Sequence, residues 1–431
     1  MALGGGTFLS ENKVLPGAYI NFVSATGASA AIGERGYAAV GLSLDWGIED
    51  SVFEVTSGDF QTDSMRLFGY DYTSEKLLYL REMFLNAKTV YCYRLNSGGT
   101  KAENKYAKAL YGGTRGNDIT ITVESAVEGG FAVITMLGGV EVDRQTVAKA
   151  ADLKANDYVS FISSATLTAE AAVPLTGGTN GTVTGLNHQE FLDKLEGYSY
   201  NVLVCGETDD TLKALYIAYT KRMRDETGVK MQSVVYNKAA DYEGVINVKN
   251  PAEGSNAAAL VYWIGGLMAG CEINKSALNR KYDGELTIEA DYTQTELKEA
   301  INAGEMTLHR VNDDLRVLSD INSLVTFSDT KSEVFADNQT LRVCDRIAND
   351  IALIFNTRYL GTVPNDNAGR IALWNDIVSH HRQLAEIRAI EDFDEEDITV
   401  TRGATKRAVV VSDAVSIVNA MGKLYMTVTV E

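Results

Sequence analysis

Asn201-Val202-Leu203-Val204-Cys205-Gly206 is a continuous apolar run between two turn-forming residues. A strand without polar alternation is typical of a parallel sheet that is covered on both faces. Thr208 or Asp209 can then cap a helix that we expect to extend to about residue 227. Because a buried strand followed directly by a helix is the repeating unit of α/β folds, the run predicts a parallel sheet with helices packed on it.

The alternation of strands and helices continues on both sides of this run. The expected elements are strands at 37–42, 88–95, 229–236 and 244–248, a helix that Ser74 caps, and a helix at 188–197. A very apolar segment follows at 257–270. It is shorter than the roughly 20 residues that cross a bilayer, so we expect a buried helix. These elements predict an α/β core.

The core pattern is interrupted by a segment rich in strand-forming residues. It begins near Ser97-Gly98-Gly99 and ends at Leu175-Thr176-Gly177-Gly178-Thr179-Asn180-Gly181. Between 119 and 161, four runs of β-branched and aromatic residues are separated by Gly, Asn or Asp turns. We interpret residues 98–177 as a β domain inserted between the two parts of the core, 25–97 and 178–340.

The last part of the chain, 341–431, is predicted to form a separate α+β assembly domain. Its first segment, 341–358, is an amphipathic helix with Cys344, Ile347, Ile351, Ile354 and Phe355 on one face. A turn at 362–367, a helix at 370–390, an acidic loop at 391–397 and a strand at 407–411 complete the expected elements.

Both ends of the chain have the character of extended arms. Leu424-Tyr425-Met426-Thr427-Val428-Thr429-Val430-Glu431 alternates apolar and polar residues, as a half-buried strand does. Chain ends fray unless something holds them, so this strand needs a partner in its own subunit or in another one. At the other end, residues 1–24 show no helical pattern, and Pro16-Gly17 introduces a short strand at 18–23.

Composition narrows the classes of function. The chain has 39 basic and 58 acidic residues, a net charge of −19, which disfavours binding to nucleic acid or to anionic lipid. The four cysteines, Cys92, Cys205, Cys271 and Cys344, are far apart in apolar runs. They predict reduced core thiols in a protein that folds in the cytoplasm, not disulfides or a zinc site. The start of the chain lacks the features of a signal peptide.

No pattern in the sequence points clearly to chemistry. The histidines are His188, His309, His380 and His381, without a metal-binding spacing, and we interpret them as surface or helix-face residues. The glycines at 177–181 lack the Lys-Ser/Thr pair of a phosphate loop, and the acidic run at 391–397 lacks the ligand spacing of a calcium loop. We expect no enzyme activity, cofactor or metal. An α/β hydrolase with an appended β domain is the alternative from another class.

Several motifs, taken in order, resemble the contractile tail sheath family of phages and related particles. They are Pro16-Gly17-Ala18-Tyr19-Ile20, Tyr111 to Ile119, Leu175 to Gly181, Tyr262 to Gly266 with Asn274-Lys275-Ser276, Arg342 to Ile351, Tyr359 to Asn365, and Leu424 to Val428. The Tyr262 and Asn274 segments are similar to the Gram-positive branch. The resemblance implies a core sometimes described as subtilisin-like, in fold only.

The resemblance also implies a function and partners. Six-subunit rings would stack around a tail tube, with baseplate and tail terminator proteins as further partners. The sheath would contract to drive the tube through a target cell envelope. Contraction would need no nucleotide. The subunit would be made and assembled in the bacterial cytoplasm and would belong to a phage virion tail. A phage-tail-like bacteriocin or injection particle is the alternative. Direct nucleic-acid contact and membrane insertion are not implied. The inserted β domain would face outward and the C-terminal domain inward.

The resemblance assigns roles to particular residues. The arms would add as strands to sheets in neighbouring subunits, through main-chain hydrogen bonds. The arm residues are Pro16, Gly17, Ala18, Tyr19, Ile20 and Phe22 at one end, and Leu424, Tyr425, Met426, Thr427, Val428, Thr429 and Val430 at the other. Arg370, Arg382 and Arg388 are candidates for contact with the tube, with Arg370 and Arg388 on one helix face. Surface solubility is the alternative role for these arginines.

Overall fold

The computed structural model describes residues 34–127 and 129–430, which fall into two compact units. The core unit contains residues 34–345 together with 419–430, and the C-terminal unit contains residues 346–418. The predicted strand at 18–23 and the N-terminal arm residues lie outside the described part of the chain. The two units are described separately below.

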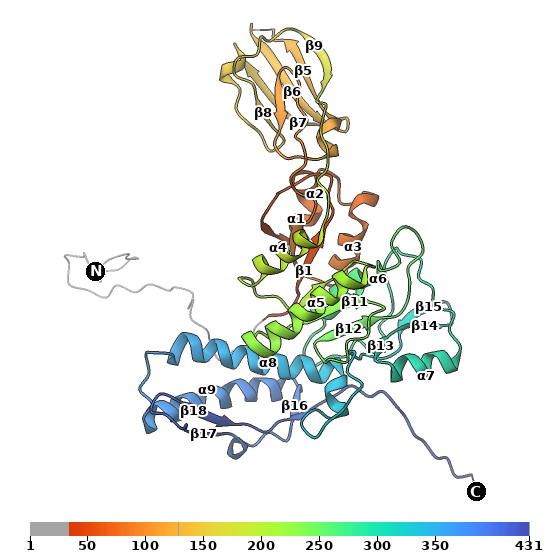
Figure 1. The fold of residues 1–431 in the computed structure, drawn as a ribbon, viewed down its shortest axis with the longest axis vertical. Helices are drawn as coiled ribbons and strands as arrows, with labels where there is room; N and C mark the ends of the chain where they lie inside the picture. Colours follow the sequence, from red (N-terminus) through yellow and green to blue (C-terminus); the bar gives the residue numbers. More distant parts are fainter. Residues whose placement is uncertain (1–33, 128, 431) are drawn as a thin grey trace, which may run out of the picture. The chain divides into compact units, whose positions relative to one another are not determined.

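The core unit is built on a seven-stranded sheet with the order β13-β12-β11-β10-β1-β3-β2 (Figure 1). Its strands are β1 (Tyr37–Leu42), β2 (Val52–Thr56), β3 (Thr89–Arg94), β10 (Val202–Val204), β11 (Gln232–Tyr236), β12 (Val245–Val248) and β13 (Glu305–Met306). All neighbouring pairs are parallel except β2 with β3. The parallel sheet predicted from residues 201–206 is therefore confirmed.

Helices cover both faces of this sheet. On one face, α3 (Leu78–Phe84) and α6 (Leu260–Gly270) pack on Ala38 and Val40 of β1. On the other, α4 (Gly185–Leu195) and α5 (Asp210–Arg222) pack on Ala39. Adjacent residues of a strand point to opposite faces, so an all-apolar strand requires this double cover. Among the described helices, none is long and apolar enough to cross a membrane, and α6 is buried as expected.

The local signals that define these helices are those seen in the sequence. The Asp209 carboxylate accepts hydrogen bonds from the backbone N–H groups of Thr211 and Leu212 and so caps α5. A turn of π-helix at Met223–Thr227 extends α5 to the predicted end. Ser74 caps the short 3-10 turn Glu75–Leu77 that leads into α3. The core unit also contains α1 (Ser57–Thr62), α2 (Ser64–Phe68), α7 (Gln294–Asn302) and the hairpin of β14 (Leu308–Val311) and β15 (Asp314–Val317).

The predicted strand-rich segment forms an antiparallel sheet with the order β7-β6-β5-β9, and a separate two-stranded pair, β4-β8. The strands are β4 (Ala107–Ala109), β5 (Ile119–Ser125), β6 (Phe131–Leu137), β7 (Val140–Val147), β8 (Val159–Phe161) and β9 (Glu170–Pro174). Their inward side chains share a core with Trp46, which comes from the loop after β1. In Figure 1 these strands form the yellow and orange layer.

The chain enters and leaves this layer through two closely packed segments that require glycine. A Cβ on Gly178 would lie 2.5 Å from the carbonyl oxygen of Gly113, and one on Gly181 would lie 1.9 Å from that of Ser97. The Asn117 side chain fastens the crossing, because its amide donates to Gly178 O at 2.9 Å and accepts from Gly178 N at 2.8 Å. The glycine pattern at 177–181 therefore serves a packed return of the chain.

The C-terminal unit contains a helical pair and two small sheets. Helix α8 (Asn338–Ile354) begins in the core unit, and a π-helical turn (Phe355–Tyr359) follows it. Then come α9 (Asn367–Glu386), β16 (Ile390–Glu391), β17 (Thr399–Arg402), β18 (Val409–Ser412) and β19 (Ser416–Ile417), with β16 paired to β19 and β17 to β18. Of the predicted α8 face, Ile351 and Phe355 pack on the buried α9 residues Leu373 and Ile377.

We predict that Gly178→Ala lowers the stability of the core unit by about 1–3 kcal/mol, because the added methyl group must push the backbone of Gly113 away. Gly185→Ala is the matched control, since nothing lies within 4 Å of the Cβ position there. It should be neutral or slightly stabilising. Urea unfolding of the full chain measures both, and equal stability of the two variants would contradict the packed crossing.

Candidate assembly site

The C-terminal arm, residues 419–430, is extended and has no strand partner in the described chain. The exposed fractions of Leu424, Tyr425 and Val430 are 86%, 88% and 89%. Both faces of the predicted strand are therefore open, although one of them consists of large apolar side chains. Of the two partners that the sequence allowed, one in the same subunit and one in another, the first is not found among the described residues.

Among the described residues, the arm forms hydrogen bonds at its root. The backbone N–H of Ala420 donates to Gln339 Oε1 at 2.9 Å, and Asn419 Nδ2 donates to the Thr340 hydroxyl at 2.9 Å. Both acceptors lie in the first turn of α8, and the Asp337 carboxylate accepts the N–H of Thr340 at 2.9 Å. The start of α8 is thus the attachment point of the arm.

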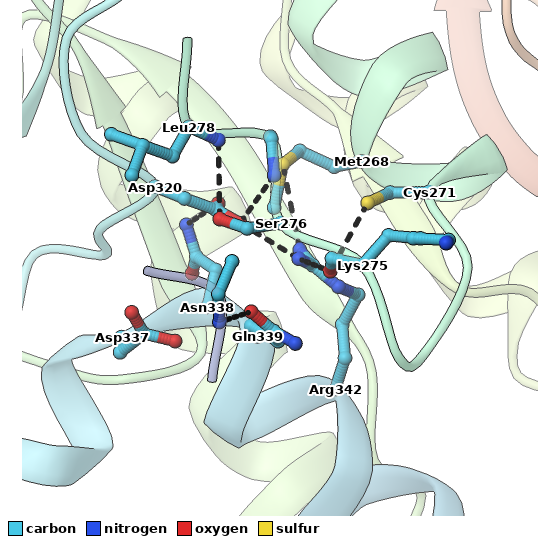
Figure 2. Close-up of polar contacts among 12 residues, drawn as sticks. Met268, Cys271, Lys275, Ser276, Leu278, Asp320, Asp337, Asn338, Gln339 and Arg342 are labelled. Carbon is cyan, nitrogen blue, oxygen red and sulfur yellow. Dashed lines mark hydrogen bonds and ion pairs between the residues drawn. The ribbon is translucent and has the colours of Figure 1, made fainter. Parts of the chain in front are cut away.

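A buried polar network holds this start of α8 in the core unit (Figure 2). Arg342 Nη2 lies 2.7 Å from Asp320 Oδ2, and the side chains of both residues are 1% exposed. Asp320 also accepts the N–H of Ala277 at 2.8 Å and the side-chain amide of Asn338 at 3.1 Å, while Arg342 donates to Lys275 O at 2.9 Å. Nearly every oxygen and nitrogen of the pair has a partner.

The electrostatics of Asp320 follow from these contacts. Burial by itself would raise the pKa of this carboxyl, because a charge is poorly solvated in the interior. The Arg342 guanidinium and the N–H donors outweigh burial and hold the pKa of Asp320 below its usual value. Asp320 is therefore ionised at neutral pH, and the pair is a true ion pair within the protein interior.

A second buried ion pair lies on the next turn of α8. Arg224, from the π-helical turn after α5, donates two hydrogen bonds to Asp345, at 2.6 and 2.8 Å. Arg224 also donates to Met231 O at 2.8 Å, at the start of β11. Between the two pairs, Gln232 Nε2 donates to Asn338 Oδ1 at 2.9 Å. The first two turns of α8 are consequently fixed to the central sheet through side chains.

The first described residues of the chain attach to the same region. Arg35 donates to the carbonyl oxygens of Cys271 at 3.0 Å and Met268 at 2.9 Å. The segment 268–278, which follows α6, therefore accepts hydrogen bonds from Arg35 and, through Lys275 O, from Arg342. One segment of the core unit therefore binds both Arg35, near the predicted N-terminal arm, and α8, which holds the root of the C-terminal arm.

Comparison with known proteins decides the family. Models of phage tail sheath domains match nearly the whole chain: the Gp18 domain III N-terminal region at 35–95, the β-sandwich domain at 97–180, the central domain at 181–323 and the C-terminal domain at 330–431. A Bacillus subtilis relative, the phage-like element PBSX protein XkdK, is 32% identical over 99% of this chain and 100% of its own length. This chain belongs to the phage tail sheath family.

Solved structures of sheath tail proteins agree with this assignment. The protein from Desulfitobacterium hafniense is 35% identical, with a TM-score of 0.83 over 95% of this sheath chain and 99% of its own. The protein from Listeria innocua is 33% identical, with a TM-score of 0.79 over 92% and 95%. The contracted helical sheath of the anti-feeding prophage, at 13% identity and a TM-score of 0.58 over 96% and 98%, shares the fold. The resemblance inferred from the motifs is confirmed.

The helix face predicted to be shared by Arg370 and Arg388 differs from the structure. Arg370 lies in α9 and donates to Asn365 O and Oδ1, both at 3.1 Å, and exposed Arg382 pairs with Glu395. Arg388 does not share a helix face with Arg370, because α9 ends at Glu386 and Arg388 has a left-handed φ of 59° in the following turn. The shared-face prediction for this sheath protein was wrong.

The interpretation of the histidines also needs correction. His188 lies in α4, and His380 and His381 lie in α9, as the helix-face interpretation expected, but all three are fully buried, so the surface interpretation is wrong for them. His380 Nε2 lies 3.0 Å from Asp350 Oδ2, and His381 Nδ1 lies 3.0 Å from Ile377 O. Burial raises the pKa of Asp350, but hydrogen bonds from His380 and Arg346 outweigh it and lower the pKa overall. The burial of a histidine cannot be predicted from the local sequence when the residue it bonds to is distant in the chain.

The cysteines agree with the expectation of reduced thiols. All four are free, with Cys92, Cys205 and Cys271 buried and Cys344 half-buried. Burial raises the pKa of Cys205 to about 12, so this thiol is protonated and unreactive. In the described residues, no group of three or more His, Cys, Asp or Glu side chains could hold a metal ion.

The sequence did not reveal the anchor of the arm. Arg342 and Asp345 belong to one of the family-like motifs, whereas no local pattern marks Asp320, Gln339 or Thr340. The available signal is a pair of opposite charges, Arg342 and Asp345, separated by the apolar residues Val343 and Cys344 at the start of a predicted amphipathic helix. That signal suggests buried pairing but does not identify the partner.

We predict that Arg342→Ala lowers the free energy of unfolding of this sheath protein by about 3–5 kcal/mol, because it leaves the Asp320 carboxylate buried without its countercharge. Arg222→Ala is the matched control in the same unit, since the Arg222–Glu196 pair is 39% and 43% exposed. It should cost at most about 1 kcal/mol. Denaturant unfolding measures both, and a similar cost for the two variants would refute the anchoring role of Arg342.

Proposed function

We propose that this chain is a structural subunit of a contractile tail sheath, in which the C-terminal arm of each subunit pairs with a sheet of a neighbouring subunit. The observation that carries the proposal is the exposed arm. It keeps a strict strand alternation in its sequence, yet it has no partner in the described chain. Membership in the tail sheath family supplies the assembly in which such a partner is available.

The energetics favour pairing between subunits. Leu424, Met426, Val428 and Val430 form the apolar face of the arm and are between 68% and 89% exposed. Complete burial of one such side chain is worth about 1.5–3 kcal/mol, which is enough to offset the ordering of an extended segment when several are buried together. Main-chain hydrogen bonds then fix the register. The anchored root means that only the distal part of the arm must be ordered.

We propose that the hairpin of β17 and β18 in a neighbouring subunit receives the arm. Each of these strands pairs only with the other in the described chain, so each has a free edge. A two-stranded sheet is marginally stable by itself, and added strands would complete it. Val410 and Val411 of β18 are 52% and 39% exposed, which provides apolar side chains for a strand laid on this edge to contact. The N-terminal arm, Pro16 to Phe22, is proposed to pair in the same way.

The larger assembly remains part of the proposal. Six subunits would form each ring, rings would stack around a tail tube between baseplate and terminator proteins, and contraction would release energy stored in subunit contacts. Assembly would take place in the bacterial cytoplasm. On the family resemblance, we also propose that the core is subtilisin-like in fold and that the domain boundaries are those expected from the sequence. The resemblance further suggests that Arg370, Arg382 or Arg388 contacts the tube. The exposed position of Arg382 and Arg388 is compatible with such contact.

A phage-tail-like particle is the second candidate for the assembly. The relative XkdK belongs by its name to a phage-like element, and it matches this chain over its whole length. A curated tail sheath protein of Clostridium phage phiCD119 is 26% identical over 47% of this chain. The subunit function is the same in both cases. Capsid and terminase genes beside the gene for this chain would indicate a phage.

Charges placed on the two faces of the arm test the strand pairing. Met426→Asp and Val428→Asp should abolish the formation of sheaths, because the apolar face must be buried against the acceptor. Thr427→Asp and Thr429→Asp add the same charge on the polar face and should allow sheaths to form. Because residues 426–429 are exposed in the subunit, all four variants should fold normally. Electron microscopy of the assembled protein provides the measurement, and equal behaviour of the two faces would refute the pairing.

Deletion of residues 424–431 tests whether the arm is needed at all. We expect a folded, unassembled subunit, since the root at Asn419 and Ala420 is retained. Size-exclusion chromatography and circular dichroism would show the folded monomer, and electron microscopy would show the loss of sheaths. If tubular sheaths still form at wild-type protein concentration, linkage through the C-terminal strand is excluded.

A further inference from the structure

A pocket lies at the point of the central sheet where α/β proteins place their ligands. The chain connects β1 to β3 on one side and later continues at β10 on the other side of β1. The connections therefore diverge between the carboxyl ends of β1 and β10, which creates a crevice outside the sheet. Residues 41–44 after β1 and 206–208 after β10 line a cavity of about 380 Å³ there, together with residues at the starts of α3 and α6.

The charged side chains that line this pocket are Lys76 and Glu207. Lys76 Nζ is 2.9 Å from Asp45 Oδ2, so its charge is already balanced. The side chain of Glu207 is 37% exposed, and the ring nitrogen Nε2 of His188 lies 3.7 Å from its Oε1. Burial, with a contribution from Asp209, raises the pKa of Glu207, as expected for a carboxyl group that lacks a full countercharge.

A buried histidine directs a proton at Glu207. The Tyr216 hydroxyl is fully buried and lies 3.0 Å from His188 Nδ1. Because a buried hydroxyl needs an acceptor, it donates to Nδ1, and the proton of the neutral ring is then on Nε2. His188 Nε2 has no hydrogen-bond partner in the described chain and lies 3.7 Å from Glu207 Oε1. Burial lowers the pKa of His188, which keeps the ring neutral.

A second acceptor lies beside Gly206, the residue before Glu207. Tyr262 of α6 is 5% exposed and stacks on Tyr79 with 4.6 Å between the ring centroids. Its hydroxyl is next to Gly206, where a Cβ would lie only 2.0 Å away. Gly206 is thus required for this tyrosine to reach the pocket. The hydroxyl makes no hydrogen bond with the described residues.

The chemistry of these groups narrows the ligand. A phosphate group, which often occupies such a crevice, is disfavoured, because Glu207 would repel it and Asp209 already occupies the first N–H groups of α5. A metal ion is also disfavoured, because the described residues around Glu207 include no cluster of three ligating side chains. A positively charged group with N–H donors fits this pocket, because the Glu207 carboxylate and the Tyr262 hydroxyl oxygen can both accept hydrogen bonds from it.

We propose that this pocket binds a protonated primary amine, whose ammonium group donates hydrogen bonds to Glu207 and Tyr262. The amine has two potential sources, a small free molecule or the side chain of a lysine from a second copy of the chain. Nothing in the tail sheath function requires such a site. The proposal therefore goes beyond the assembly role, and its first test uses the unassembled subunit.

The test is a calorimetric titration of the full-length, unassembled protein with n-butylammonium chloride. NaCl keeps the ionic strength constant. Glu207→Gln should weaken binding at least tenfold, and Tyr262→Phe, which keeps the ring stacking, should weaken it several-fold. Glu190→Gln, an exposed carboxylate on α4, is the matched control and should bind as the wild type does. Thermal unfolding without ligand verifies that each variant is folded.

Two results would overturn the proposal. One is an absence of wild-type binding beyond that of tetramethylammonium, which has the charge without an N–H donor. The other is equal affinity of the wild type and of both pocket variants. Sheath assembly with added n-butylammonium then distinguishes the sources. Inhibition of wild-type assembly would indicate a lysine of a second copy, whereas unaffected assembly would indicate a free amine.

Discussion

The ion pair between Arg342 and Asp320 is the interaction on which the arrangement of this sheath protein depends. It lies in the protein interior, where both side chains are 1% exposed, and it fixes the first turn of α8. The same turn holds the root of the C-terminal arm through Gln339 and Thr340. Because a buried pair is costly to separate, the root stays in place while the distal arm is free to pair.

This arrangement divides the arm into two parts with opposite properties. The root has specific polar contacts, whereas Leu424 to Val430 expose large apolar side chains. Such a surface would be a liability in a protein that works alone, since unpaired apolar strands promote aggregation. In the proposed assembly, burial of the same surface against a neighbouring subunit would supply affinity. The segment 268–278 accepts hydrogen bonds from Arg35 as well as from Arg342.

The core unit contains both tightly packed and open regions. The crossing at Gly113 and Gly178 leaves no space for a side chain, and Asn117 locks it by two reciprocal hydrogen bonds. The strand-rich layer is therefore held closely where the chain crosses between it and the rest of the core unit. In contrast, the crevice between β1 and β10 stays open, because the diverging connections leave no element to fill it. A fold of this type contains such a hollow whatever its function.

The sequence by itself determined the elements whose signals are local. Continuous apolar runs at β1, β3 and β10 required a covered parallel sheet, and the capping residues Ser74 and Asp209 located the helices that follow them. The alternation at the C-terminus required a strand partner without showing where that partner is. Periodicity reports the average environment of a segment, so these features could be predicted.

Only the tertiary structure decided which distant side chains meet. Arg342 and Asp320 are 22 residues apart, Arg224 and Asp345 are 121 apart, and His188 reaches Tyr216 from another helix. The position of Arg388 beyond the end of α9 also depended on a turn that the helical pattern did not indicate. A charged or polar residue has the same local pattern whether it is solvated or paired. Its burial depends on long-range packing, which no short stretch of sequence encodes.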